Sequence, residues 1–297
     1  MYDVVCFGSA VVDVFVNTDV SETNKKICYP AGTKMLIKDL KFDVGGGGTN
    51  TAVAFSRFGL KTGFIGKIGD DDSGKRIIEV LKKERVDFLG KIEKGKASGY
   101  SVVLDSREKE RTILTYKAIN NDVSPSDIKK VKTKWLYFSS LLGKSFETQV
   151  KLARQLKKQG TKIAFNPSAY IIEEKNIKPL LSICDVVILN KEEAEMIVGK
   201  NKDLLKGLRK LGPKIAVITD KNRPIYCSDG VKKYSLMPHK IKVVERTGAG
   251  DAFAAGFVAG LMSNKGIADS LKLGLRESES VLGYFGTKNR LLRLRLK

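Results

Sequence analysis

The sequence predicts an α/β fold, with a doubly wound, mostly parallel sheet flanked by helices. In the second half of the chain, short apolar runs alternate with longer helix-like segments. Strands are expected at 135–139, 163–166, 186–189 and 215–219. Helices are expected between and around them, at 146–159, 192–198 and 204–211. Such alternation is typical of a parallel sheet covered on both faces, and the apolar run Val186–Leu189 fits a strand buried on both sides.

The first half of the chain follows the same pattern with a β-rich interruption. The elements expected there are a strand from Val4 to near Asp13, a helix at 51–58, a strand at 62–69 and a helix at 75–84. Residues 14–41 are irregular and hydrophilic, apart from a short β-like patch at 34–37. Residues 98–116 have the pattern of a hairpin, with a charged turn at 105–110. Because no linker or repeat separates these parts, we expect one domain.

Composition excludes several classes of protein. No run approaches the roughly 18–20 apolar residues that a membrane-spanning helix needs. The N-terminus reads directly as a strand and lacks a basic leader, so we expect a cytoplasmic protein. The four cysteines are far apart, which favours free thiols over disulfides or zinc. The net charge of +21 is spread along the chain without interleaved aromatic residues, so we expect a solvated basic surface rather than a nucleic-acid site.

Polar residues follow several predicted strands at the point where each strand ends. They are Asp13, Asn166, Asn190, Thr219 and Asp251. In a doubly wound sheet, ligands bind at the carboxyl ends of the strands. One polar residue after a strand is an ordinary loop residue, but five at one edge would form a site.

The stretch Arg246–Phe253 contains the strongest local pattern. An extended run at 241–244 precedes it, and a small, apolar, helix-like segment at 254–262 follows. The unpaired N–H groups in the first turn of a helix suit a phosphate or a developing anion. Taken alone, Asp251 could equally be a helix cap.

Two other motifs have equally plausible structural interpretations. The glycine run that ends at Asn50 could be a flexible loop or could wrap a polyol, and it lacks the Lys-Ser/Thr ending of a P-loop. Asn190 and Glu193 match a capping box as well as they match a binding motif.

Together these motifs resemble the ribokinase/PfkB family of sugar and nucleoside kinases. The resemblance rests on Gly8 to Asp13, GGGGTN at 45–50, NKEE at 190–193 and TGAGDAF at 247–253, in matching order over the whole chain. It implies a single ribokinase-like kinase domain over 1–297, with a small β-sheet lid formed by about 14–41 and 98–116. It also implies ATP and Mg²⁺ as cofactors.

The resemblance implies a role for each matching residue. Asp251 would be the catalytic base, with the backbone of Gly248, Ala249 and Gly250 as the anion hole. Substrate hydroxyls would be held by Asp13, Gly46, Gly47, Asn50 and Asp251. Nucleotide contacts would come from Asn190, Thr219, Lys221, Thr247, Gly248 and Gly250. Glu193 would organise Mg²⁺ through water.

The chain departs from the family pattern at three places. Glu245-Arg246 stands where the family often has Asp-Thr, so a monovalent cation (K⁺) near this acid is left open. Lys221 and Pro224 stand where glycines commonly contact the nucleotide. Gly47 replaces the lysine of the ribokinase loop, which argues against strict ribose specificity.

The first hypothesis is therefore an ATP-dependent phosphotransferase that moves the γ-phosphoryl group to a hydroxymethyl group of a sugar or nucleoside. The alternative is a catalytically altered family member that acts as a nucleic-acid-associated or regulatory binding protein, for which the +21 charge is the main argument. A homodimer through the edge of the lid is also possible, because β-edges invite pairing.

Overall fold

A nine-stranded sheet forms the centre of the part of the chain that the computed structural model describes, which is residues 1–24, 26–107 and 111–296. Its strands are β1 (Tyr2–Phe7), β6 (Thr62–Ile65), β8 (Val86–Phe88), β12 (Thr133–Ser139), β13 (Lys162–Asn166), β14 (Val186–Asn190), β15 (Ile215–Asp220), β16 (Arg223–Ser228) and β17 (Lys233–Leu236). Their spatial order is β17-β16-β15-β14-β13-β12-β1-β6-β8. The pairs from β15 to β8 are parallel, whereas β16 and β17 are antiparallel additions. The predicted α/β fold class is confirmed.

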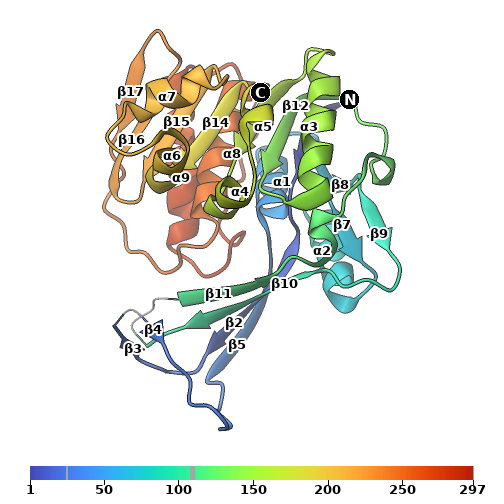
Figure 1. Cartoon of the computed structure of the whole chain (residues 1–297), viewed down its shortest axis with the longest axis vertical. Coiled ribbons are helices and arrows are strands. Elements are labelled where there is room, and N and C mark those ends of the chain that lie inside the picture. The colour runs from blue at the N-terminus through green and yellow to red at the C-terminus, as the bar shows by residue number, and fades with distance from the viewer. Residues whose placement is uncertain (25, 108–110, 297) are drawn as a thin grey trace.

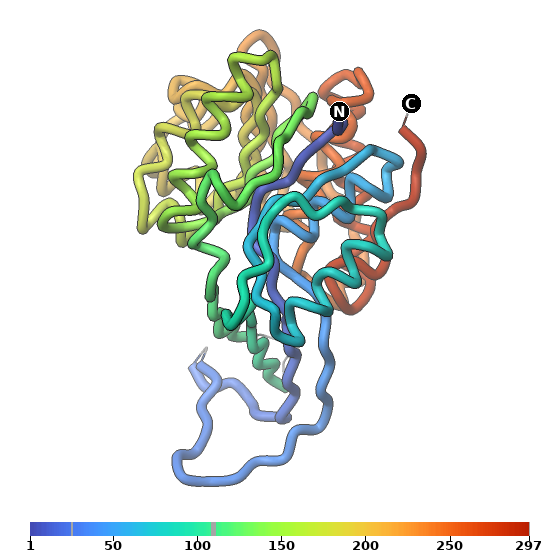
Figure 2. The backbone as a smooth tube through the Cα atoms, turned by 90° about the vertical axis from the view of Figure 1, so that its right-hand side faces the viewer, coloured from blue at the N-terminus to red at the C-terminus, as the bar shows by residue number. Residues whose placement is uncertain are grey.

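Helices cover both faces of this sheet (Figure 2). One face carries α1 (Gly47–Arg57), α2 (Asp72–Lys83), α8 (Ala249–Met262) and α9 (Ile267–Leu282). The other carries α3 (Gly143–Lys157), α4 (Ala169–Glu174), α5 (Lys178–Leu181), α6 (Lys191–Val198) and α7 (Leu204–Lys210). Successive residues of β1 alternate between the two hydrophobic cores, as the two-residue period of a strand requires. Among the described residues, no helix is long and apolar enough to cross a membrane.

The direction of chain growth reverses beside β1. After β1, the chain adds β6 and β8 on one side of it. It then adds β12, β13, β14 and β15 on the other side. Open α/β sheets bind ligands outside the carboxyl ends of the strands near such a reversal.

A second, four-stranded sheet, called the lid sheet or lid below, projects from the body (Figure 1). It consists of β2 (Val11–Asn17), β5 (Asp39–Gly45), β10 (Gly99–Asp105) and β11 (Arg111–Tyr116), in the order β11-β10-β2-β5. Small pairs also form between β3 (Glu22–Thr23) and β4 (Lys26–Ile27), and between β7 (Lys67–Gly69) and β9 (Lys91–Glu93). Short 3₁₀ turns lie at Ala118–Asn121 and Pro125–Asp127.

The prediction of one strand from Val4 to Asp13 is wrong. The central strand stops at Phe7, and Asp13 lies in the middle of the lid strand β2. Asn120 explains the break, because its side chain donates to the Ala10 carbonyl and accepts from the Ala10 N–H, each at 2.9 Å. These bonds replace the ladder bonds that would have continued the strand. The lid therefore begins at Val11 rather than at 14 and extends to Gly45 rather than to 41.

Other element boundaries also differ from expectation. The patch at 34–37 is not a strand, since the lid strand runs from 39 to 45 instead, and the run at 241–244 does not pair in a sheet. The helix expected from Thr51 begins at Gly47, inside the glycine run. Gly66 interrupts the strand predicted at 62–69. The hairpin strands at 98–116 are confirmed, whereas residues 108–110 of its predicted turn lie outside the described residues.

A buried ion pair joins the ends of two helices. Arg57, at the end of α1, donates two hydrogen bonds to the Glu84 carboxylate, at 2.9 and 2.6 Å. The two side chains are only 10% and 8% exposed. The hydrogen bonds from Arg57 lower the pKa of Glu84, so this stabilisation is present above the unfolded pKa and is lost as acid protonates the carboxylate.

We predict that Glu84→Gln lowers the free energy of unfolding at neutral pH by about 3–5 kcal/mol, because it leaves the Arg57 charge buried without its carboxylate. Urea unfolding followed by circular dichroism measures the change. Asp72→Asn is the matched control, since Asp72 pairs with Lys75 on an exposed surface and such pairs contribute little. Equal losses in the two variants would contradict the prediction.

Candidate active site

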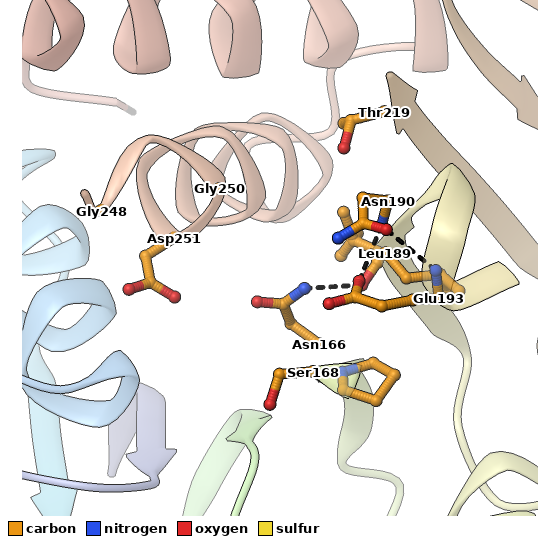
Figure 3. Close-up of a pocket in the computed structure, with 11 residues that line it drawn as sticks. Asn166, Ser168, Leu189, Asn190, Glu193, Thr219, Gly248, Gly250 and Asp251 are labelled. Atoms are coloured by element: carbon orange, nitrogen blue, oxygen red, sulfur yellow. Dashed lines mark hydrogen bonds between the residues drawn. The ribbon is translucent and has the colours of Figure 1, made fainter. Parts of the chain in front are cut away.

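A pocket of about 240 Å³ opens where the carboxyl ends of β13, β14 and β15 meet the start of α8 (Figure 3). Seven residues that were predicted for the site line it: Asn166, Asn190, Glu193, Thr219, Gly248, Gly250 and Asp251. Segments more than 80 residues apart in the chain supply them. The parallel topology thus brings together most of the polar strand ends that the sequence singled out.

The N-terminus of α8 forms one wall of the pocket. Gly248 is its N-cap, in the left-handed conformation with φ 82°. A side chain there would be strained, and its Cβ would lie 2.9 Å from Cβ of Thr287. The first N–H groups of an α-helix lack intrahelical partners, and no side chain caps this one. The Ala249 N–H donates to the Arg246 carbonyl at 3.3 Å and Ala249 does not line the pocket, whereas Gly248 and Gly250 do. The helix dipole adds partial positive charge at the same point, so the wall suits an anion.

Asp251 lies in the first turn of α8, and a residue far away in the chain holds its carboxylate. The Asn50 amide donates to Oδ2 of Asp251 at 2.8 Å. Burial raises the pKa of Asp251, while this hydrogen bond and the charge of Lys288 oppose the rise. The carboxylate is therefore a stronger proton acceptor than a solvated aspartate, which is the property that a general base needs.

The glycine run provides close packing rather than a flexible loop. Gly46 has φ 94°, and a Cβ there would lie 2.5 Å from the Ser9 carbonyl oxygen. A Cβ on Gly47 would lie 2.9 Å from Cβ of Ser139 and 3.3 Å from Oδ1 of Asp251. The absence of side chains lets α1 begin against β1 and β12, which places Asn50 beside Asp251.

Asp13 does not line this pocket, because it belongs to the lid. Burial raises its pKa to about 6, against a hydrogen bond from Ser101 and the charge of Lys288. A Cβ on Gly45 would lie 1.8 Å from Oδ2 of Asp13. The Asp13 carboxyl group therefore occupies space that is open only because a glycine stands on the neighbouring lid strand. Asp13, on lid strand β2, and Asp251, on helix α8, both interact electrostatically with Lys288.

Asn190 and Glu193 form the capping box that their spacing predicts. Asn190 Oδ1 accepts from the Glu193 N–H at 2.9 Å, and Glu193 Oε2 accepts from the Asn190 N–H at 2.8 Å. Burial raises the pKa of Glu193, and backbone N–H groups of Asn190 and Ala169 oppose the rise. Both residues also line the pocket, so the structural and the binding interpretations are compatible. Among the described side chains, no group of three or more acids, histidines or cysteines could hold a metal ion.

Two residues predicted to bind nucleotide lie outside the pocket lining. Lys221 is in the turn between β15 and β16, where its exposed ammonium is 3.6 Å from Glu192. The Thr247 hydroxyl oxygen accepts a hydrogen bond from Arg111 of lid strand β11, at 2.6 Å. Arg111 also pairs with Glu245, which accepts the Thr247 N–H at 2.8 Å. A lid arginine therefore holds the loop just before the anion-binding helix turn.

Lys288, which no sequence pattern indicates, is buried beside α1. Its ammonium donates to the Val44 carbonyl and, at 2.5 Å, to Oδ1 of Asn50. Burial lowers its pKa, whereas the charges of Asp43, Asp13 and Asp251 oppose that change. No motif marks this lysine among the 54 basic residues of the chain, and its role depends on a contact with α1.

The chain is similar in sequence to known carbohydrate kinases. A family model described as pfkB family carbohydrate kinase matches residues 1–292. The chain is 28% identical to 5-dehydro-2-deoxygluconokinase of Clostridium perfringens over 300 residues, which covers 92% of this chain and 85% of that protein.

Solved structures show the same fold. Adenosine kinase from Sinorhizobium meliloti superimposes with a TM-score of 0.84 at 21% identity, covering 98% of this chain and 97% of that one. Arabidopsis thaliana ribokinase complexed with ribose and ATP gives a TM-score of 0.82 at 20% identity, covering 98% and 96%. The match over nearly the whole chain means that this protein belongs to the pfkB family of carbohydrate kinases and is an enzyme of that type.

Proposed function

We propose that this kinase transfers the γ-phosphoryl group of ATP to a hydroxymethyl group of a sugar or nucleoside. The observation that carries the proposal is the position of Asp251. Its carboxylate is bonded to Asn50 and lies in the first turn of α8, beside N–H groups that border the pocket. A proton acceptor and an anion-binding surface therefore share one helix turn.

In the proposed mechanism, Asp251 accepts the proton of the acceptor hydroxyl as its oxygen forms a bond to the γ-phosphorus. The bond from that phosphorus to the β-γ bridging oxygen breaks, and ADP leaves. The N–H groups of Gly248, Ala249 and Gly250 stabilise the charge on the transferring phosphoryl oxygens. Asn50 keeps Asp251 in position during the reaction. The Asp251 carboxylate must be ionised in order to accept the proton.

The pocket fits the phosphate end of a nucleotide. Its volume is below the roughly 300–1,000 Å³ of sites that enclose a whole small molecule. Asn190 and Thr219 would contact the phosphates. Glu193 would hold Mg²⁺ through water, since its carboxylate already accepts hydrogen bonds from the backbone N–H groups of Asn190 and Ala169. Bound Mg²⁺ would neutralise phosphate charge. Lys221 and Thr247 stay predicted nucleotide contacts.

The acceptor would lie between the lid and the body, held by Asp13, Asn50, Asp251 and the backbone of Gly46 and Gly47. The names of similar proteins include a deoxygluconate derivative, adenosine and ribose as substrates or ligands of those proteins. This range supports a hydroxymethyl-bearing sugar or nucleoside as the class.

We predict that Asp251→Asn lowers kcat by at least about 10²–10⁴-fold, because the amide cannot accept the proton. ATP consumption with a panel of sugars, sugar acids and nucleosides measures the rate, and calorimetry should find ATP binding largely unchanged. Asp269→Asn is the matched control, since Asp269 is an exposed acid in the first turn of α9. Turnover near the wild-type rate in Asp251→Asn would show that the base is assigned incorrectly.

We propose that Arg111 supplies the positive charge that a monovalent cation would otherwise bring to Glu245. The guanidinium pairs with this buried carboxylate and with the Thr247 hydroxyl. A K⁺ ion at the same carboxylate would compete with this ion pair.

We therefore expect the same kcat in buffers containing K⁺ or tetramethylammonium at equal ionic strength. Arg111→Met should lose activity, because the loop before the anion hole loses its lid contact, and added K⁺ should restore part of it. Arg107→Met, on the exposed side of the lid, is the control. Strong activation of the wild-type enzyme by K⁺ would rule out this role of Arg111.

We propose that two chains associate through their lids. One face of the lid sheet has an apolar row in which Phe42, Val14, Val102 and Leu114 are cross-strand neighbours. Val14 is buried, and Arg76 of α2 covers the Phe42 ring at 5.1 Å, so the exposed part of the row is toward Leu114. Phe42 and Leu114 are 49% and 57% exposed. An apolar sheet face of this kind is typical of an interaction surface.

Light scattering after size exclusion should therefore give about twice the chain mass of 32.7 kDa. Leu114→Lys should give a monomer with unchanged melting temperature, whereas Val231→Lys, at an exposed valine in another part of the molecule, should stay dimeric. A monomeric wild-type protein would contradict the proposal.

A further inference from the structure

Lys288 is a buried cation at the proposed catalytic centre whose chemistry the transfer step does not use. It lies in the segment after α9, and the backbone of that segment is fixed by Arg57, which donates to the Lys288 carbonyl at 2.5 Å. The ammonium reaches Asn50, and Asn50 reaches Asp251. We propose that Lys288 is a positioning residue for the general base: its ammonium orients the Asn50 amide and thereby the Asp251 carboxylate. This inference rests on the proposed function.

The first argument is the direction of the Asn50 amide. An ammonium group has only donors and a carboxylate only acceptors, so an amide between them has one favourable orientation. Oδ1 of Asn50 accepts from Lys288 at 2.5 Å and from the Thr287 hydroxyl at 3.0 Å, and its Nδ2 donates to Asp251 at 2.8 Å. A flipped amide would place NH₂ against NH₃⁺ and a carbonyl against the carboxylate.

The second argument is that this bond selects one oxygen of Asp251. Because Oδ2 accepts from Asn50, Oδ1 is the oxygen that faces the space left by Gly47. A Cβ on that glycine would lie 3.3 Å from Oδ1. The acceptor hydroxyl would approach Oδ1 from the same side, which Gly47 shares with the Ser139 side chain. Lys288 therefore determines which oxygen receives the proton.

Lys288 also acts on Asp251 through its positive charge. The titratable groups that interact with Asp251 from the surrounding elements are Cys6 on β1, Tyr137 on β12, Tyr170 on α4 and Lys288. Burial raises the pKa of the two tyrosines and the cysteine, to about 12 for Tyr170, so they stay neutral at ordinary pH. Lys288 itself faces Asp13 and Asp43 from the lid and Arg57 from α1. Among these groups, Lys288 is thus the cation that lowers the pKa of Asp251.

The test compares the pH dependence of kcat in wild-type enzyme, Lys288→Met and Lys288→Arg. Asp251 must be ionised, so activity falls as pH decreases through its pKa. Methionine removes the charge at similar length, and we expect the acid limb of kcat to move up by about one pH unit, with a lower plateau. Arginine restores the charge and should return the limb toward the wild-type position.

Measuring kcat at a saturating concentration of acceptor separates the effect of Lys288 on Asp251 from the effect of Asp13 on acceptor binding. Protonation of Asp13, whose pKa is about 6, acts on acceptor binding and appears in KM rather than in kcat. Lys157→Met is the matched control, because Lys157 also pairs with a carboxylate, that of Asp185, but on the opposite face of the sheet. Its acid limb should coincide with that of the wild-type enzyme.

A wild-type acid limb in folded Lys288→Met would overturn the inference, as would a change in KM alone, which would make Lys288 an acceptor contact. If neither variant folds, the wild-type enzyme decides. Its kcat should fall at a pH below the ordinary lysine pKa as Lys288 loses its proton, and a flat alkaline profile would contradict the role. If the proposed function itself is wrong, the result differs. Asp251→Asn would then stay active, independently of the result with the Lys288 variants.

Discussion

The hydrogen bond from Asn50 to Asp251 is the contact on which the site depends. It joins the first turns of α1 and α8, which are separated by about 200 residues in the chain. Both helices begin at glycines, so their backbones approach the sheet and each other more closely than side chains would permit. Close approach brings the N-termini of the two helices to one place. The N–H groups of Gly48 and Thr49 in α1 donate to the Ser9 carbonyl there, and the start of α8 borders the pocket. It also buries Asp251, which raises the basicity of its carboxylate at the point where an anion would bind.

The lid is coupled to this centre by charge and by hydrogen bonds. Arg111 connects β11 to the loop before α8, and Lys288 donates to the Val44 carbonyl of β5 as well as to Asn50. On the inner face of the lid, Phe15 packs edge-on against Phe285 at 4.5 Å between ring centroids. Since lid strand β2 also carries Asp13, a shift of the lid would move this carboxyl group and disturb the contacts of Arg111 and Lys288 together. Under the proposed function, such a shift would couple acceptor binding to the support of Asp251.

Elements with strong local patterns were predictable. Alternating strands and helices after residue 135 follow from apolar runs whose period and length leave little choice, and the capping box at Asn190 and Glu193 forms as its spacing indicates. The path between Phe7 and Val11 was not predictable, because Asn120 decides it from more than 100 residues away. The start of α1 was placed too late for a related reason. Glycines have low helix propensity in isolation, and here packing against β1 and Ser139 overrides that preference.

The sequence by itself determined the fold class, the family pattern and most of the polar residues that line the pocket, because those properties reside in local periodicity and in short motifs. Only the tertiary structure decided that Asp13 belongs to the lid, that Arg111 reaches Glu245 and that Lys288 supports Asn50. Each of these depends on a side chain meeting a partner from a distant segment. The identity of a lysine or arginine does not indicate which carboxylate or amide it will meet, since its long side chain can pair in many directions. Folding selects one partner by burying the charge, where it must be satisfied by a neighbour instead of water.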